Sequence, residues 1–281
     1  MQPGDNLLVH YHDANLLVLE KPSGLLSVPG RGPDLQDCLS SRIQTHFPTA
    51  LVVHRLDRDT SGLMIMALDK ASQRNISLQF EERKVQKVYE CIVQGTPAQH
   101  SGCITLPIGR DLTRPPRYKI DHEKGRFSET SWSMLENQNG HARLRIEPRT
   151  GRSHQIRLHL ASVDHPILGD PLYADATALA AADRLLLHAR EIQFSHPMTG
   201  ETVCWHSSVS FICCALRAAG DDAWRGGSRS GPPGGAGRPR ARGGRAGRPG
   251  RGARARAARA GACCRGRPLG AALLLPGAQV R

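Results

Sequence analysis

The ten residues HRLDRDTSGL at positions 54–63 form the densest run of reactive side chains in this chain. Short apolar runs flank the segment, at 51–53 and at 63–67. Such runs are typical of buried strands, and the second is apolar at every position, which predicts a strand in the centre of a sheet. The polar segment between the two runs is therefore expected to be a loop presented at the edge of that sheet.

Further strand patterns lie on both sides of this loop. Residues 16–19 form an apolar run that ends at a Lys-Pro-Ser-Gly turn, and residues 88–93 form another apolar run. Residues 142–147 alternate apolar and charged side chains, which predicts a strand with one solvated face.

Helical patterns are fewer than strand patterns. Asp69 is expected to cap a helix in which Ile76 and Phe80 share one face. Ser153 is expected to cap a second helix, whose buried face follows the spacing i, i+4, i+7. The residues of that face are Ile156, Leu160 and Val163. Because the strand–helix alternation of a parallel sheet is missing, the sequence predicts an α+β fold with a mainly antiparallel sheet.

Charge divides the 281 residues into two parts. Residues 1–222 are nearly neutral, with 24 basic and 25 acidic side chains, whereas residues 223–281 carry 14 Arg and no acidic residue. The second part consists largely of Arg, Gly, Ala and Pro, a composition that predicts a disordered basic tail. Two explanations stay open for it: an arginine-rich segment that contacts RNA, or translation of sequence that was never selected for a fold. We expect one folded domain at 1–222.

Several classes of protein are excluded by composition. No apolar stretch approaches the ~20 residues that span a bilayer, and the amino terminus lacks the features of a secretory signal, so we expect a cytoplasmic protein without membrane contact. The eight Cys include no C-x-x-C pair, which predicts reduced thiols and no zinc site. His154 and His159, spaced i, i+5, point apart on a helix and are poor joint metal ligands. We expect neither a metal nor a cofactor.

Three further segments concentrate polar chemistry. Residues 149–159, RTGRSHQIRLH, place cations at a helix start, which suits a phosphate or an essential carboxylate but also fits a plain charged face. Residues 110–126 are rich in Arg and Lys without periodicity, and are expected to form a long exposed loop, either a solvated connection or an arm that contacts phosphates. Residues 184–189, RLLLHA, are expected to be mainly core. Taken alone, segment 54–63 could also be a salt-bridged turn.

Five motifs, in order, resemble those of the RluA family of pseudouridine synthases. They are KPSGL at 21–25, HRLD with TSGL at 54–63, GRSHQIR at 151–157, HPILGD at 165–170 and LLHA at 186–189. The resemblance runs from about residue 5 to residue 211 and has no place for an N-terminal S4 domain. It implies isomerisation of a uridine already in RNA, in a central cleft between two halves hinged near residue 100. The reaction involves neither redox change nor hydrolysis, so no cofactor is implied.

The resemblance also assigns site residues. Asp57 would act covalently on the substrate or assist formation of a glycal, Arg157 would pair with it, and Tyr89 would stack on the uracil and could take part in removing the C5 proton. Residues expected to bind the substrate are Arg55, which fills the space of the flipped base, His54, Leu187, Arg114, Arg117 and Lys119.

The implied partners are structured RNAs: one uridine of 23S rRNA and position 32 of tRNA anticodon stem-loops. Arg58 and Asp59 depart from the pattern of enzymes with this double target, so the same chemistry at a different site of large-subunit rRNA is the alternative. A non-catalytic RNA-binding protein on the same scaffold is a further one. We expect a monomer.

Overall fold

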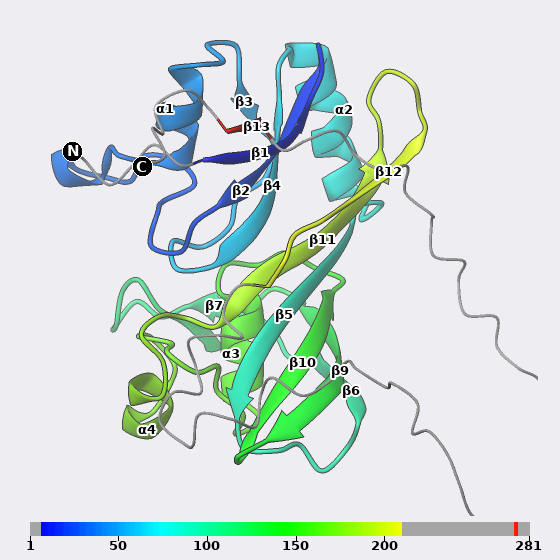
Figure 1. Ribbon diagram of the computed structural model, residues 1–281. Helices are drawn as coiled ribbons and strands as arrows, with labels where there is room; N and C mark the ends of the chain where they lie inside the picture. The colour runs from blue at the N-terminus through cyan, green and yellow to red at the C-terminus, as the bar shows by residue number, and fades with distance from the viewer. Residues whose placement is uncertain (1–6, 210–272, 275–281) are drawn as a thin grey trace, which may run out of the picture.

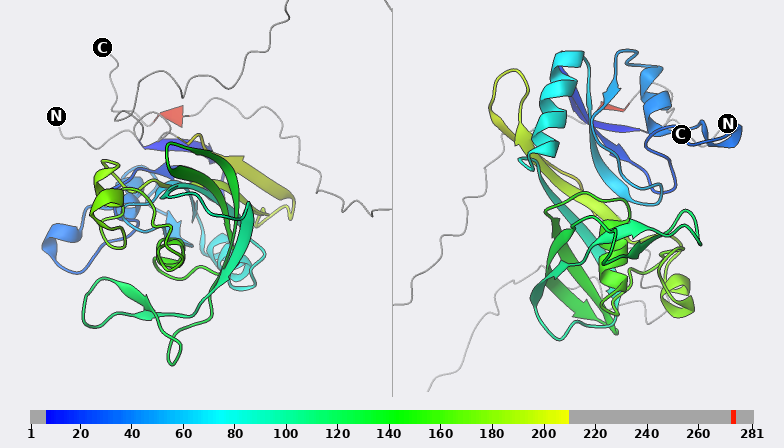
Figure 2. Two further views of the ribbon diagram at one scale, coloured as in Figure 1. Left: turned by 90° about the horizontal axis from the view of Figure 1, so that it is seen from below. Right: turned by 180° about the vertical axis from the view of Figure 1, so that it is seen from behind.

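The computed structural model describes residues 7–209 and the backbone of residues 273–274. A mixed sheet of eleven strands, most of them antiparallel, organises this part of the chain, and a separate two-stranded sheet projects from it (Figures 1 and 2). Few helices flank these sheets, so the expected α+β class with a mainly antiparallel sheet is confirmed. Among the described residues, no helix is long and apolar enough to cross a membrane.

The first half of the molecule precedes the long strand β5. Its elements are β1 (Leu8–His12), β2 (Leu16–Lys21), the short 3₁₀ helix Pro33–Leu35, α1 (Leu39–Gln44), β3 (Leu51–Val52), β4 (Ser61–Ala67) and α2 (Lys70–Glu81). Every residue of β4 is buried, as its apolar run predicts. The Asp69 side chain accepts a hydrogen bond from the backbone N–H of Ser72 at 2.8 Å, so α2 begins at its expected cap.

The second half is built mainly from antiparallel strands. Its elements are β6 (Ser101–Thr105), β7 (Ile108–Arg110), β8 (Tyr118–Ile120), β9 (Glu129–Gln138), β10 (His141–Pro148), α3 (Gln155–Ala161) and α4 (Ala176–Ala180). Two long strands, β5 (Gln86–Gln94) and β11 (Leu187–Ser195), run through both halves (Figure 1). The strands β12 (Thr202–His206) and β13 (Leu273–Leu274) complete the set.

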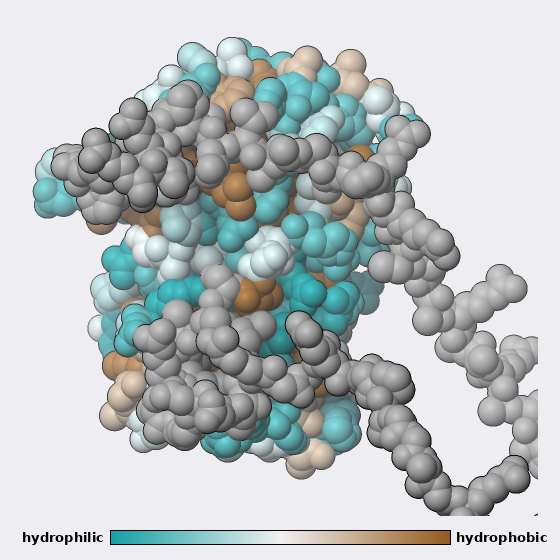
Figure 3. Space-filling view, in the orientation of Figure 1, coloured by the Kyte–Doolittle hydropathy of each residue, from teal (hydrophilic) through white to brown (hydrophobic). Residues whose placement is uncertain are grey.

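The strand order joins the two halves into one sheet. It reads β13-β1-β2-β4-β11-β5-β10-β9-β6, with β12 added to β11 and β3 added to β4. The chain passes between the halves along β5 and returns along β11, so the expected hinge near residue 100 is wrong. Three apolar clusters form the core, and Tyr89 of β5 packs against two of them, where the halves meet. On the face shown in Figure 3, hydrophilic residues cover most of the coloured surface.

Three local expectations are wrong. His154, with φ 55°, stands at the start of α3 without a side-chain cap, so Ser153 does not cap this helix. The helix ends at Ala161, and Val163 lies beyond it with 38% of its surface exposed. The expected irregular loop at 110–126 instead continues a hairpin, because β7 pairs with β8 and Ile108 bonds back to Arg126. The expected tail, 223–281, lies outside the described residues except for β13.

The one parallel pairing of the described sheet depends on a glycine. Gly62 of β4 lies opposite Ala189 of β11, has φ +114°, and a Cβ there would stand 2.3 Å from the Ala189 carbonyl oxygen. This close approach joins the end of the 54–60 loop to the strand that carries Leu187.

Replacing Gly62 by alanine is expected to lower the free energy of unfolding by about 2 to 4 kcal/mol, because it adds backbone strain and a steric clash at one position. Urea denaturation measures the loss. The matched control is Gly200→Ala, where φ is also positive, at +73°, but nothing lies within 4 Å of the added Cβ. Equal losses for the two variants would contradict the proposed clash.

Candidate active site

Asp57 faces a cleft at the boundary between the two halves. Its loop connects β3 to β4, and its side chain is 20% exposed. Residues from four separate segments line the cleft with it: Arg55, Tyr89, Arg157 and Leu187 among them. The fold therefore brings all three expected catalytic residues and two expected substrate contacts to one place.

The segment after β2 holds the Asp57 loop in position. Lys21 is fully buried, and its Nζ donates hydrogen bonds to the carbonyl oxygens of Pro22, Leu25 and Arg58 at 2.7–2.8 Å. Burial lowers the pKa of this ammonium group to about 7, an effect that the nearby Asp59 and Asp57 carboxylates oppose. Three acceptors match the three N–H groups of a protonated lysine, so Lys21 ties the turn at 22–25 to the Asp57 loop.

Ser27 fixes the same loop one residue before Asp57. Its Oγ donates to the Leu56 carbonyl oxygen at 2.7 Å and accepts from the Leu56 N–H at 3.1 Å. Sequence reasoning assigned no role to Lys21 or Ser27. The KPSGL motif is the signal that could have found the first, whereas nothing in the local pattern indicates the second.

Arg157 is a buried cation held mainly by Asp170. It is 2% exposed, and its Nε and Nη2 donate to the two Asp170 oxygens at 2.8 and 2.6 Å. Its Nη1 lies 3.8 Å from Oδ2 of Asp57, which is an ion pair without a hydrogen bond. Burial alone would lower the pKa of Arg157, but the Asp170 contacts outweigh it and the pKa is raised. Arg157 therefore brings a fixed positive charge to Asp57.

Asp170 reaches Arg157 because of the turn before it. Gly169 has φ +69°, and a Cβ there would stand 2.0 Å from the Arg184 carbonyl oxygen, so only glycine fits this approach. Oδ1 of Asp170 also accepts hydrogen bonds from the N–H groups of Leu172 and Tyr173 at 2.8 and 3.2 Å. Asp170 was part of a recognised motif, yet sequence reasoning gave it no function.

Tyr89 and Leu187 form the apolar part of the cleft. They lie on the neighbouring strands β5 and β11, where Leu187 is buried and Tyr89 half-buried. Burial, and then the nearby Asp57 carboxylate, raise the pKa of Tyr89. The phenol is therefore neutral at physiological pH, and the part of the shift due to Asp57 disappears whenever that carboxylate loses its charge.

Arg55 and His54 differ in their placement. Arg55 is exposed and lines both the Asp57 cleft and a second cleft beside it. His54 lines only the second cleft; its Nε2 accepts a hydrogen bond from the Ile65 N–H at 2.9 Å, and its ring stacks on Phe80 at 4.6 Å between centroids. Burial lowers the pKa of His54 to about 3, so the imidazole is neutral. Its contacts support β4 directly.

Basic side chains continue on both sides of the Asp57 cleft. The second cleft is lined by five cations, which are Arg55, Arg83, Lys87, Arg149 and Arg152. A third cleft, under the β7–β8 hairpin, is lined by four, which are Arg110, Lys124, Arg126 and Arg152. Arg152 lines all three clefts, so cations border the site continuously, an arrangement suited to a polyanion.

The hairpin presents the remaining expected contacts. Arg114 is 68% exposed and pairs with Asp111 at 3.2 Å, and Lys119 is 55% exposed, 3.9 Å from Asp121. Arg117 is half-buried, with its guanidinium 5.2 Å from the centre of the Tyr173 ring. None of the three lines the cleft around Asp57.

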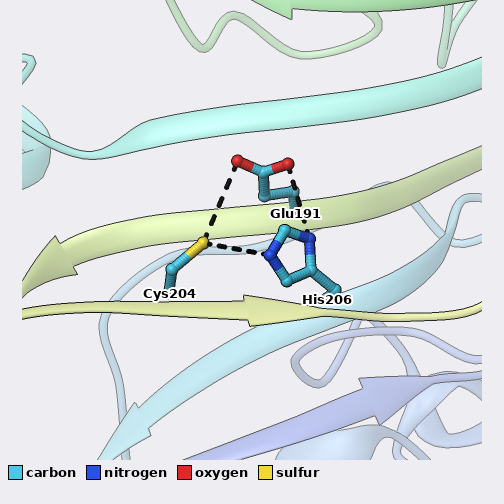
Figure 4. A group of neighbouring side chains, drawn as sticks. All are labelled: Glu191, Cys204 and His206. Carbon is cyan, nitrogen blue, oxygen red and sulfur yellow. Dashed lines mark hydrogen bonds and ion pairs between the residues drawn. The ribbon is translucent and has the colours of Figure 1, made fainter. Parts of the chain in front are cut away.

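One side-chain cluster elsewhere contains possible metal ligands. Cys204 Sγ lies 3.9 Å from Oε1 of Glu191 and 3.5 Å from Nε2 of His206, while the other ring nitrogen of His206 faces Glu191 at 3.4 Å (Figure 4). An imidazole can direct only one nitrogen to an ion, and the Arg145 guanidinium stands 4.0 Å from Glu191. The three side chains thus fit hydrogen bonding better than chelation.

Comparison with known proteins gives a consistent match. The family model described as RNA pseudouridylate synthase matches residues 15–162. The dual-specificity RNA pseudouridine synthase RluA of Yersinia pestis is 42% identical over 206 residues, which cover 73% of this chain and 100% of that protein. The protein of the same name from Escherichia coli K12 is 41% identical over 206 residues, covering 73% and 94%.

Solved structures agree with the fold. Human RNA pseudouridylate synthase domain containing 1 superposes with a TM-score of 0.63 at 28% identity, covering 74% of this chain and 86% of that one. Human RNA pseudouridylate synthase domain containing 4 superposes with a TM-score of 0.58 at 24% identity, covering 72% and 88%, and supports the fold alone.

Proposed function

The chain belongs to the RNA pseudouridylate synthase family and forms pseudouridine in RNA, and on this premise we propose that it has two targets, a uridine of 23S rRNA and position 32 of tRNA anticodon stem-loops. The similarity to proteins named dual-specificity RluA supports the double target. One observation carries the assignment of the site: Asp57, Arg157, Tyr89 and Leu187 meet in a single cleft bordered by cations.

Asp57 is the proposed reacting group. Its carboxylate either bonds to C1′ or assists glycal formation as the N1–C1′ bond breaks, with the bonding electrons leaving on the uracil. The uracil turns, C5 bonds to C1′, any bond to Asp57 breaks, the C5 proton departs and N1 gains a proton. The Arg157 guanidinium, with Nη1 3.8 Å from Oδ2 of Asp57, places a positive charge beside the reacting carboxylate.

The target base must leave its stack to reach Asp57. Arg55 is exposed at the rim shared by the Asp57 cleft and the second cleft, where it can occupy the vacated space. Tyr89 and Leu187 offer the flat apolar surface on which a flipped uracil packs. The Tyr89 phenol is neutral in the free enzyme, and its proposed part in removing the C5 proton belongs to the last step, after C5 has bonded to C1′.

Tritium release tests the proposed targets. Isomerisation frees the C5 hydrogen, so two transcripts labelled with 5-tritiated uridine, an anticodon stem-loop and a 23S rRNA fragment, report it directly. We expect release from both, and none with Asp57→Ala. Release from only one of the two transcripts would narrow the target to that RNA and make Arg58 and Asp59 the first residues to exchange.

The exposed cations of the hairpin are expected to contact RNA phosphates. Arg114→Ala and Lys119→Ala should each reduce the slope of log K against log salt concentration by about 1 in filter-binding titrations. Arg42→Ala is the matched control, since this cation lies on α1 in the first half of the molecule and not on the hairpin. An unchanged slope in both hairpin variants would remove the hairpin from the RNA interface.

The domain boundary is also a proposal. We propose that residues 1–222 form the catalytic domain of a cytoplasmic, monomeric enzyme. A chain ending at Asp222 should keep its activity on the stem-loop within about threefold, because β1 retains its antiparallel partner β2 when β13 is removed. Gel filtration measures whether the shortened chain is folded and monomeric, and tritium release measures its activity. Loss of folding or turnover would show that the tail is required.

A further inference from the structure

We propose that Tyr173 is a positioning residue that couples RNA binding by the β7–β8 hairpin to the catalytic pair of Arg157 and Asp57. This inference rests on the proposed function of the hairpin as an RNA contact. The hairpin projects from the body of the molecule (Figure 2), whereas Asp57 lies in the cleft at the boundary of the two halves. Tyr173 contacts both the hairpin and Arg157.

The Tyr173 ring interacts with two guanidinium groups. The Arg157 Cζ lies 5.4 Å from the ring centroid, and the Arg117 Cζ of the hairpin lies 5.2 Å from it. Both distances are within the range of cation–π attraction. A shift of Arg117 that repositions this ring therefore also changes the surroundings of Arg157.

The Tyr173 hydroxyl is held by two hydrogen bonds, one to the hairpin and one to the residue before α3. It accepts from the backbone N–H of Tyr118 in β8 at 2.8 Å and lies 2.8 Å from Nδ1 of His154, just before α3. Burial lowers the pKa of His154, which favours the neutral imidazole. Its Nδ1 can therefore accept a hydrogen bond from the Tyr173 hydroxyl. The rings of His154 and Tyr118 also meet edge to face at 5.2 Å.

The backbone of Tyr173 is fixed to the carboxylate that holds Arg157. Its N–H donates to Oδ1 of Asp170 at 3.2 Å, and the same oxygen accepts from Arg157 at 2.6 Å. Arg157 therefore has two of its contacts, Asp170 and the Tyr173 ring, on one short segment. The Asp57–Arg157 distance of 3.8 Å leaves room for a closer contact, and catalytic contacts of this kind often tighten when substrate binds.

Arg117 is suited to transmit the binding of an RNA phosphate from the hairpin to Tyr173. Among the described residues, no carboxylate lies within ion-pair distance of its guanidinium, in contrast to Arg114, which pairs with Asp111. An RNA phosphate bound by Arg117 would thus order a side chain that already rests on Tyr173. The hairpin would then contribute to the rate of the chemical step and not only to affinity.

Single-turnover tritium release at saturating stem-loop RNA tests this coupling. Arg117→Ala is expected to lower the saturating rate about tenfold in the parent protein, and less than about twofold when Tyr173 is already leucine, because the two act through one contact. Arg114→Ala, on the same hairpin but without contact to Tyr173, should raise KM alone. The proposal would be overturned if Arg117→Ala raised KM alone. It would also be overturned if the rate losses of Arg117→Ala and Tyr173→Leu multiplied fully in the double variant.

Tyr173→Phe keeps the test decisive if the leucine variant does not fold. This variant retains the ring and loses the hydrogen bonds to Tyr118 and His154, so the saturating rate per folded molecule should fall about fivefold, and the thermal stability should fall as well. An unchanged saturating rate would contradict the coupling. If the parent releases no tritium from either transcript, the proposed targets fail, and the same variants are then compared on total 5-tritiated cellular RNA.

Discussion

Asp57→Asn is expected to lower pseudouridine formation at least about 10⁴-fold while RNA binding and folding stay intact. Asparagine preserves the shape of the side chain but cannot act as a carboxylate toward the sugar. The fold should tolerate the change, because Arg157 keeps its two short hydrogen bonds to Asp170. The contact that it loses, to Asp57, is longer at 3.8 Å and is not a hydrogen bond. Tritium release, filter binding and urea denaturation separate the three effects.

Asp59→Asn is the matched control for this experiment. Asp59 lies two residues away on the same loop, and its side chain forms a 3.0 Å ion pair with Arg58, which is 56% exposed. Although the Asp59 side chain itself is only 18% exposed, an ion pair with a solvated arginine contributes little to stability, so activity is expected to stay within about threefold of the parent. Comparable losses of activity in the two variants would mean that any charge change in this loop lowers activity, and that the Asp57 carboxylate has no special role.

Local patterns in the sequence predict the strands and the position of the Asp57 loop well. The 63–67 run is a central strand because all of its side chains are apolar, and Asp69 caps α2 because its carboxylate reaches a free N–H of the first turn. These are short-range properties, decided within a few residues. The family resemblance supplies the residues that meet in the cleft, since Tyr89 and Arg157 have no local signal of their own.

Long-range contacts could not be predicted in the same way. The support of Arg157 by Asp170 crosses 13 residues, and the bond from Lys21 to the Arg58 carbonyl crosses 37. The β7–β8 hairpin escaped prediction because each strand has only three residues, too few to show a period of two. The start of α3 was misplaced because His154 adopts a left-handed conformation that its residue type does not announce.

Asp170→Asn is expected to lower the free energy of unfolding by about 3–5 kcal/mol. The substitution leaves the Arg157 guanidinium, 2% exposed, without its buried counter-charge. The nearest remaining carboxylate is Asp57, so Arg157 should turn toward it and misplace the reacting group. We therefore expect activity per folded molecule to fall on the order of 100-fold as well.

A second buried carboxylate provides the comparison for Asp170. Glu90 is 1% exposed and bonds to Arg143 at 2.5 Å and to Arg190, but as the neighbour of Tyr89 on β5 it points to the opposite face of the sheet. Glu90→Gln should therefore cost similar stability without changing the rate per folded molecule. A rate loss equal to that of Asp170→Asn would mean that lost stability alone explains both.

The double variant Asp170→Leu with Arg157→Met separates the structural role of this pair from its catalytic role. Replacing both partners of a buried ion pair by apolar side chains of similar volume is often neutral for stability, so urea denaturation should show recovery of most of the loss. Tritium release should not recover, because the Arg157 guanidinium that faces the Asp57 carboxylate at 3.8 Å is then missing from the cleft. Recovery of turnover with stability would show that Arg157 only fills space, and Asp57 would then have to react without a paired charge.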